Sequence, residues 1–159
     1  MTVNIKGDLM NFSVPKIMGI LNVAPDSFFD GGKYNSSYKI LKQVEKMIIS
    51  GADIIDVGGY SSRPGASDIS INEELSRVIP VIKLIRKKFP NSLISIDTFR
   101  SKVANESIIS GADIINDISG GSLDPEMFNT AAKLKVPYIL MHYQLNPLGF
   151  LNHLYLFSF

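Results

Sequence analysis

The chain has 159 residues and a formal net charge of +1, with 45% hydrophobic and 19% charged residues. This composition is typical of a globular domain with a sizeable core. Because there is no cysteine, disulfides, thiolate metal sites and cysteine nucleophiles are excluded within this sequence. The longest basic run is Arg86-Lys87-Lys88, which argues against a nucleic-acid binder. Without an apolar stretch of about 18 residues or a signal-peptide core, we expect a cytoplasmic protein that does not enter membranes.

The predicted elements begin with a hairpin over residues 2–12, which turns at Lys6-Gly7-Asp8. Short apolar strands and amphipathic helices then alternate along the chain. The strands are expected at Ile17–Leu21, Asp53–Val57, Leu93–Ile96, Asp113–Ile115 and Val136–Met141. The helices are expected at Ser37–Ser50, after Ser70 as far as Lys88, at Ser101–Ser110 and from Asp124 to Leu134.

The second helix carries two local signals. Ser70 and Glu73 have the spacing of a capping box, which predicts that the helix begins there. Pro80 lacks the N–H of a helix interior, so we expect a kink or two short helices around it.

One nine-residue segment occurs twice. Residues 48–56 and 108–116 match at every position except the last, which is Asp56 in one copy and Asn116 in the other. Each copy contains a helix end, a glycine stop and a buried strand. Such units repeat in parallel sheets with right-handed crossovers, and both a (β/α) barrel and an open doubly wound sheet fit the pattern.

Polar residues stand where every predicted strand ends: Asn22, Asp56, Asp97, Asn116-Asp117 and His142. In a parallel barrel these ends share the rim that carries the chemistry. The segment Gly58–Ala66 adds Arg63, which can clamp a phosphate bidentately. Asp97 can accept two N–H bonds from a planar heterocycle, and Asn116 can both donate and accept. Together these groups indicate a phosphorylated nitrogen heterocycle as the ligand.

The same residues resemble the motifs of the dihydropteroate synthase family. The matching segments follow the family's order and spacing and are residues 18–28, 30–32, 56–66, 96–98, 111–117 and 141–142. The resemblance implies a (β/α)8 TIM barrel, here a partial barrel of about five parallel strands. It also implies condensation of 6-hydroxymethyl-7,8-dihydropterin pyrophosphate with p-aminobenzoate, which gives 7,8-dihydropteroate and pyrophosphate.

The resemblance assigns roles to the residues that handle the pyrophosphate and the aminobenzoate. Asn22 would ligate Mg²⁺, the expected cofactor, or contact the pyrophosphate. Ser62 and Arg63 would bind the pyrophosphate and shape the aminobenzoate site, and Arg63 is a candidate catalytic residue. Asp26, in a loop covering the aminobenzoate, is a second catalytic candidate.

The pterin side of the site is assigned in the same way. Asp97 and Asn116 would hold the ring, and Asp97 would also stabilise positive charge as the C–O bond breaks. Met141 would line the pocket, and Asp56 completes the substrate-binding set. The family usually forms homodimers through late helices that are missing here, so the sequence does not give the oligomeric state of this chain.

The sequence departs from the family's pattern in three places. Ala24 and Tyr60 stand where the family usually has Thr and Glu. A complete barrel needs about 250 residues and eight strands. We therefore interpret the chain as truncated after the fifth strand, with a hairpin at 1–14, a partial barrel at 15–142 and a divergent hydrophobic tail at 143–159 that folds loosely over the open sheet edge.

Two other functions remain open. The chain could be an inactive remnant that at most binds pterin. It could also be a different pterin-dependent barrel enzyme, such as a methyltetrahydrofolate methyltransferase. The Ser62-Arg63 clamp favours the synthase, because a methyl carrier has no pyrophosphate to hold.

Overall fold

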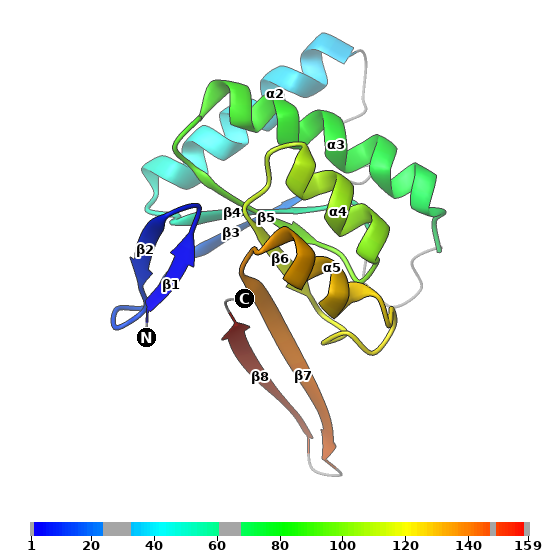
Figure 1. Cartoon of the computed structure of the whole chain (residues 1–159). Helices are drawn as coiled ribbons and strands as arrows, with labels where there is room; N and C mark the ends of the chain where they lie inside the picture. The colour runs from blue at the N-terminus through cyan, green and yellow to red at the C-terminus, as the bar shows by residue number, and fades with distance from the viewer. Residues whose placement is uncertain (1, 24–32, 61–67, 147–148, 158–159) are drawn as a thin grey trace.

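The computed structural model describes residues 2–23, 33–60, 68–146 and 149–157. Its strands are β1 (Thr2–Ile5), β2 (Asp8–Asn11), β3 (Met18–Asn22), β4 (Ile54–Gly58), β5 (Leu93–Asp97), β6 (Ile114–Asp117), β7 (Tyr138–Asn146) and β8 (Gly149–Phe157). Its helices are α2 (Lys33–Ile49), α3 (Ile71–Lys88), α4 (Ser101–Ile109) and α5 (Met127–Leu134). Figure 1 shows the helices on one side of the main sheet and the β1–β2 hairpin on the other.

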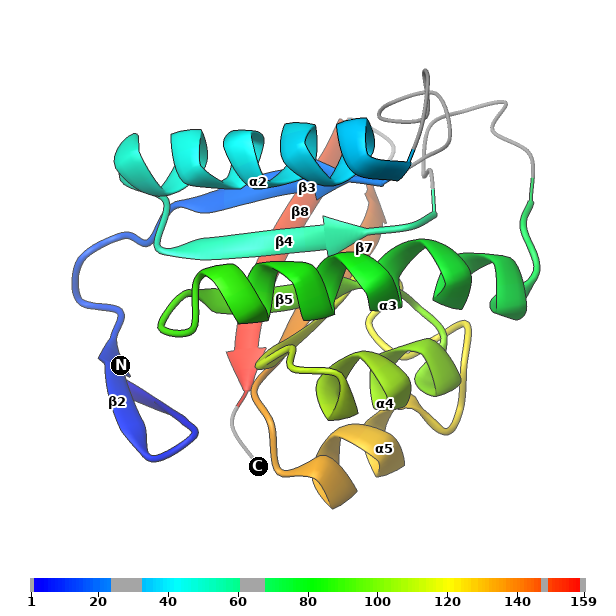
Figure 2. The same cartoon turned by 90° about the horizontal axis from the view of Figure 1, so that it is seen from above.

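The main sheet has the order β3-β4-β5-β6-β7-β8. The first five strands are parallel, and each is joined to the next by a helix, as in a TIM barrel. Figure 2 shows α2, α3, α4 and α5 following one another across the sheet. The predicted partial barrel of five parallel strands and its N-terminal hairpin are confirmed.

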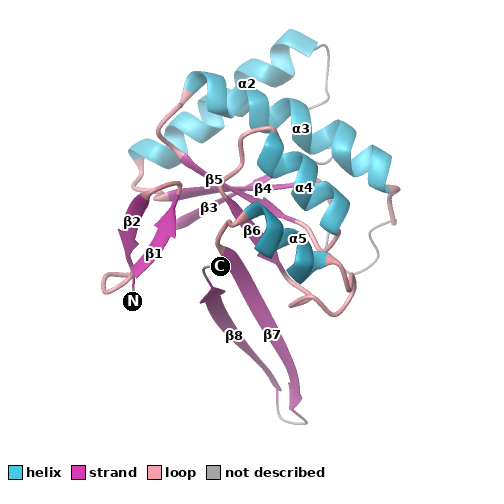
Figure 3. Ribbon diagram, viewed as in Figure 1, coloured by secondary structure: helices cyan, strands magenta, loops and turns pink. Residues whose placement is uncertain are grey.

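Two groups of buried side chains hold these layers together. The larger group fills the space between the sheet and the helices, and its fully buried members include Val57, Ile82 and Ile96. The smaller group joins Val3 and Ile5 of the hairpin to the opposite face of the sheet. The hairpin therefore packs against the inner face of the sheet near the amino ends of its strands (Figure 3).

Helix α3 begins as the sequence predicts and then departs from it. The Ser70 side chain accepts a hydrogen bond from the Glu73 N–H at 3.1 Å. Pro80 lies inside one continuous helix, however, so the expectation of two short helices is wrong. Pro80 is exposed, whereas Val78, Val81 and Ile82 around it are buried. Tertiary packing on both sides of the proline thus compensates for the missing hydrogen bond.

Helix α5 begins later than the sequence predicts, at Met127 rather than at Asp124. The carboxylate of Asp124 accepts hydrogen bonds from the N–H groups of Ser101 at 2.7 Å and Glu126 at 3.0 Å. These bonds lower the pKa of Asp124 against the opposing effect of burial. Asp124 therefore caps α4, a long-range contact that spacing alone does not reveal.

The C-terminal part of the chain is more regular than the sequence predicts. Strand β7 continues through His142 to Asn146, and β8 pairs with it antiparallel. The expectation of a loosely folded tail is wrong for the backbone, because the tail extends the sheet as a β-hairpin. No helix in the described ranges is long and apolar enough to cross a bilayer.

Candidate active site

The polar residues at the carboxyl ends of the strands form one row across the sheet. Asn22 pairs with Gly58, Gly58 with Asp97, and Asp97 with Asn116. A Cβ placed on Gly58 would lie 3.3 Å from Asp97 Oδ2 and 3.4 Å from Asn22 Oδ1. The two side chains therefore converge above a glycine, where a larger residue would crowd both of them.

Asp56 lies one layer below this row, inside β4 rather than at its end as predicted, because β4 continues to Gly58. It is 3% exposed, and both of its carboxylate oxygens are used. Ser95 Oγ donates to Oδ1 at 2.5 Å, and Asn116 Nδ2 donates to Oδ2 at 3.0 Å. Burial raises the pKa of Asp56, while these two hydrogen bonds act in the opposite direction.

The other end of the Asn116 amide is unsatisfied. Its Oδ1 is buried and has no hydrogen-bond partner among the described residues. A buried polar atom without a partner is costly, so such an atom at a strand rim is a candidate ligand contact.

Asp97 has an unusual electrostatic environment. Burial, followed by the negative charges of Asp56, Glu74 and Asp117, raises its pKa to about 7. Asp97 can therefore exchange between acid and carboxylate near neutral pH, which is the behaviour expected of a group that handles charge in a reaction.

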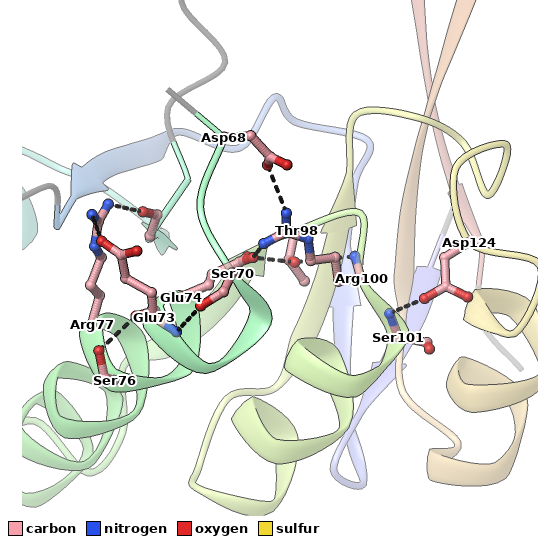
Figure 4. Close-up of polar contacts among 11 residues, drawn as sticks. Asp68, Ser70, Glu73, Glu74, Ser76, Arg77, Thr98, Arg100, Ser101 and Asp124 are labelled. Carbon is pink, nitrogen blue, oxygen red and sulfur yellow. Dashed lines mark hydrogen bonds and ion pairs between the residues drawn. The ribbon is translucent and has the colours of Figure 1, made fainter. Parts of the chain in front are cut away.

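A fully buried carboxylate, Glu74 of α3, fixes the turn that follows Asp97 (Figure 4). Thr98 Oγ1 donates to Glu74 Oε1 at 2.7 Å, and an Arg100 guanidinium nitrogen lies 2.8 Å from Oε2. The charge of Glu74 is thus paired and hydrogen-bonded, as a buried charge must be. The turn carrying Asp97 is consequently anchored to a helix behind the sheet.

Arg100 also contacts the residues that flank segment 61–67. Its second guanidinium nitrogen donates to Asp68 at 3.0 Å, as Figure 4 shows. Its guanidinium carbon lies 5.3 Å from the Tyr60 ring centre and 5.1 Å from that of Phe99. Tyr60, one of the departures from the family's pattern, therefore provides an aromatic face for a cation.

The structure brings together Asn22, Asp56, Asp97 and Asn116, four of the predicted site residues. Met141 lies on β7, two residues beyond Ile139, whose side chain is buried on the inner face of the sheet. Alternation along the strand places Met141 on that same face. Asp26, Ser62 and Arg63 lie outside the described residues, so their roles stay predictions.

Two residues of the predicted rim differ from expectation. The Asp117 carboxylate accepts bonds from the N–H groups of Ser119 and Gly121 and from the Tyr138 hydroxyl. It therefore stabilises the following turn, and burial together with this contact raises the pKa of Tyr138. His142 does not end a strand, because β7 continues four residues beyond it.

Sequence reasoning missed Ser95, Glu74 and Arg100. Glu74 carries a signal that could have revealed it, since it lies four residues before Val78 on the buried face of α3. For Ser95 the signal is its position two residues before Asp97 on the same face of β5.

Two further features bear on ligand binding. A groove of about 760 Å³ runs along the outer edge of β3, where Ile20, Asn22, Lys42 and Lys46 line it. Within the described ranges, no group of three or more His, Cys, Asp or Glu side chains is arranged to hold a metal ion.

Comparisons with known proteins show which family the chain resembles over most of its length. A sequence profile of the pterin binding enzyme family matches residues 18–153. Folic acid synthesis protein fol1 of Pneumocystis carinii is 57% identical over 136 residues, which are 86% of this chain and 18% of that protein. Dihydropteroate synthase of Bacillus subtilis is 55% identical over 126 residues, 79% of this chain and 44% of the relative.

A solved structure is also similar over most of the chain. Dihydropteroate synthase of Xanthomonas albilineans with 4-aminobenzoic acid superposes with a TM-score of 0.80 at 36% identity, covering 91% of this chain and 53% of that one. The chain thus spans about half the length, or less, of the proteins that it matches. The family match across most of the sequence and the partial barrel with its polar rim lead to one conclusion: the chain belongs to the family of pterin binding enzymes.

Proposed function

We propose that this chain carries the pterin-binding part of a dihydropteroate synthase, which joins 6-hydroxymethyl-7,8-dihydropterin pyrophosphate to p-aminobenzoate. The observation that carries the proposal is the pair of acceptors at the rim, Asp97 and the unpartnered Oδ1 of Asn116. The ring of a pterin presents N–H and NH2 donors along one edge, which such acceptors can bind. The synthases among the relatives support this choice of substrate.

The chemistry follows from where charge develops. The amine nitrogen of p-aminobenzoate attacks the methylene carbon of the pterin, the C–O bond breaks, and pyrophosphate leaves with the bonding pair. The nitrogen then releases one proton to solvent, which leaves the secondary amine of the product. Positive charge grows on the pterin as this bond breaks, and ionised Asp97 stabilises it. Because the Asp97 pKa lies at about 7, a substantial fraction of the carboxyl is ionised at neutral pH.

Magnesium is the proposed cofactor, and the donor chemistry fits it. Asn22 Oδ1 lies at the rim above Gly58 and is an oxygen donor of the kind that Mg²⁺ prefers, whereas Asp97 is assigned to the pterin. Mg²⁺ commonly binds through one or two protein oxygens together with substrate phosphates, so a large cluster of ligands is not required. When bound, the ion would offset the negative charge of the pyrophosphate, and Asn22 would hold it.

The remaining parts of the proposal rest on the family resemblance. Ser62 and Arg63 bind the pyrophosphate, and Asp26 belongs to the cover of the aminobenzoate site. The protein works in the cytoplasm, which cell fractionation would test, and analytical ultracentrifugation would show whether it forms the homodimer that is usual in the family.

Pterin binding without turnover is the second candidate function. The observation that favours it is the pairing of Asp97 with Asn116 at the rim, since both residues are assigned to the pterin ring. The methyltransferase alternative gains no support from the relatives reported above.

Calorimetric titration of the purified chain separates these functions. The chain is titrated with the pterin pyrophosphate and Mg²⁺, and p-aminobenzoate is then added while pyrophosphate release is measured. Asp97→Asn should weaken binding at least tenfold, whereas Asp53→Asn, at the opposite end of the strands, should leave it unchanged. Release supports the synthase, binding without release supports the second function, and no binding contradicts both.

A further inference from the structure

Three side chains form a hydrogen-bonded chain across three neighbouring strands. Ser95 of β5 donates to one oxygen of Asp56 in β4, and Asn116 of β6 donates to the other. Ser95 is fully buried and Asp56 is 3% exposed. Both oxygens of Asp56 are thus occupied inside the protein, which leaves this carboxylate poorly placed for direct contact with a substrate.

The chemistry of the three groups fixes the direction of the chain. An ionised carboxylate only accepts hydrogen bonds, whereas a side-chain amide has a donating end and an accepting end of almost the same shape. Asn116 must therefore turn Nδ2 toward Asp56, which leaves Oδ1 at the opposite end, buried and without a partner in the described part of the chain. Without the carboxylate, nothing in this triad would distinguish the two amide orientations.

We propose that Asp56 is a positioning residue, itself held by Ser95, that locks the amide of Asn116 with its oxygen toward the ligand and so selects ligands that present an N–H donor there. The inference rests on the proposed function in taking that ligand to be a pterin. It assigns to Asp56 an indirect role in place of the direct substrate contact expected from the sequence.

The lock has a consequence for specificity. A ligand with a donor opposite Asn116 Oδ1 satisfies a buried acceptor, whereas a ligand with an acceptor there places two acceptors face to face. Leaving such a buried group unpaired costs affinity by roughly tenfold to a hundredfold. If the amide were free to turn, Asn116 would serve both kinds of ligand and this discrimination would be lost.

Ser95 contributes through Asp56 alone. Its buried hydroxyl donates to Asp56 Oδ1 and so holds the carboxylate whose other oxygen accepts from Asn116. Ser95→Ala should therefore weaken the lock without removing it, because the bond between Asn116 and Asp56 remains. Substitution of a residue that contacts the ligand directly would instead lower the affinity for all ligands alike.

The orientation can be measured without any ligand. In the chain labelled with ¹⁵N and ¹³C, a coupling through the hydrogen bond from Asn116 Nδ2 to Asp56 Cγ should be detected by NMR, with slow exchange of the bonded amide proton. The same coupling should persist in Asp53→Asn, which alters an unrelated carboxylate. If the coupling is absent at neutral pH and Asp56 is found to be protonated there, the proposal is overturned.

The second measurement tests selectivity. The probes are 6-hydroxymethylpterin and 6-hydroxymethyllumazine, in which a carbonyl acceptor replaces the 2-amino donor. We expect the wild-type chain to bind the lumazine at least tenfold more weakly than the pterin, and Asp56→Asn to show a difference of less than threefold, because its Asn116 can turn its NH2 group toward the acceptor. Equal selectivity in both chains would contradict the lock. If the coupling is present and the wild type binds no probe, the proposed function fails while the positioning of Asn116 stands.

Discussion

The two copies of the repeated segment have the same local structure. In the first copy Gly51 N donates to Ile48 O and Asp53 N to Ile17 O, and in the second Gly111 N donates to Ile108 O and Asp113 N to Ile94 O. The Asp53 carboxylate accepts from Ile17 N at 2.9 Å, as that of Asp113 does from Ile94 N at 2.8 Å. The shared sequence thus specifies a helix end, a turn and a carboxylate tied to the neighbouring strand.

The surroundings of the two carboxylates nevertheless differ. The side chain of Asp53 is 30% exposed and pairs with Lys16, whereas that of Asp113 is 2% exposed and contacts both Arg86 and Lys6. Lys6 belongs to the turn of the N-terminal hairpin, and Arg86 belongs to α3. The two identical segments therefore contribute differently to the free energy of unfolding, because the hairpin and α3 contact only the second aspartate.

The single difference between the copies lies where they meet. Asn116 donates to Asp56 across the 60 residues that separate the copies. Two carboxylates at this distance would repel each other, while an amide and a carboxylate attract. The one substitution between the repeats is thus the one that allows their ends to bind each other.

Replacing the two repeat aspartates in parallel should give the largest contrast. Asp113→Ala leaves the partly buried Arg86 without its carboxylate partner and Ile94 N without its side-chain acceptor. We therefore expect a loss of about 3–5 kcal/mol in the free energy of unfolding. Asp53→Ala should cost only about 1 kcal/mol, because its pair with Lys16 is solvated. Urea denaturation measures both values, and equal losses would refute the role given to the hairpin and α3.

Making the two repeats identical should have the next largest effect on the free energy of unfolding. Asn116→Asp places a second carboxylate against Asp56, which raises the apparent pKa values of the pair. The folded state then binds protons that the unfolded state releases, so stability falls as the pH rises. We expect a loss of about 2–3 kcal/mol at pH 8 and a much smaller one at pH 5. A loss independent of pH would show that shape, rather than charge, matters at this position.

Local sequence predicted the regular parts of this molecule well. The hairpin, the five parallel strands and the helix start at Ser70 follow from patterns of a few neighbouring residues. The same reasoning placed Asn22, Asp97 and Asn116 at one rim, because parallel strands end at the same edge of a sheet.

Contacts between distant residues were not predictable in this way. The burial of Glu74 depends on Thr98 and Arg100, which lie more than 20 residues further along the chain. The continuity of α3 through Pro80 depends on packing against the sheet, which outweighs a local preference. The two partners of Asp56 could likewise not be predicted, since only the register of β4, β5 and β6 brings Ser95 and Asn116 beside it.

The two glycines of the repeat offer a smaller contrast. Both have positive φ, +95° at Gly51 and +118° at Gly111, so alanine is strained at either position. A Cβ at Gly51 would meet nothing within 4 Å, whereas one at Gly111 would lie 3.1 Å from Arg86 Cγ. We expect Gly111→Ala to cost about 1 kcal/mol more than Gly51→Ala in thermal or urea unfolding. Equal costs would mean that Arg86 moves aside freely.

The smallest expected effect is the pH dependence supplied by Asp53. Its bond from Ile17 N, followed by that from Lys16, lowers the pKa of Asp53 below its usual value of 3.8. The folded state therefore releases this proton more readily than the unfolded state. The resulting stability is present above the unfolded pKa and is lost as the pH falls through the folded pKa. Between about pH 5 and pH 2 the free energy of unfolding should fall less in Asp53→Asn than in the wild type, by a difference of less than about 1 kcal/mol. If the slope in this range is the same in the variant and the wild type, the bond to Ile17 N does not favour the ionised carboxylate, and the resemblance between the two copies is one of shape alone.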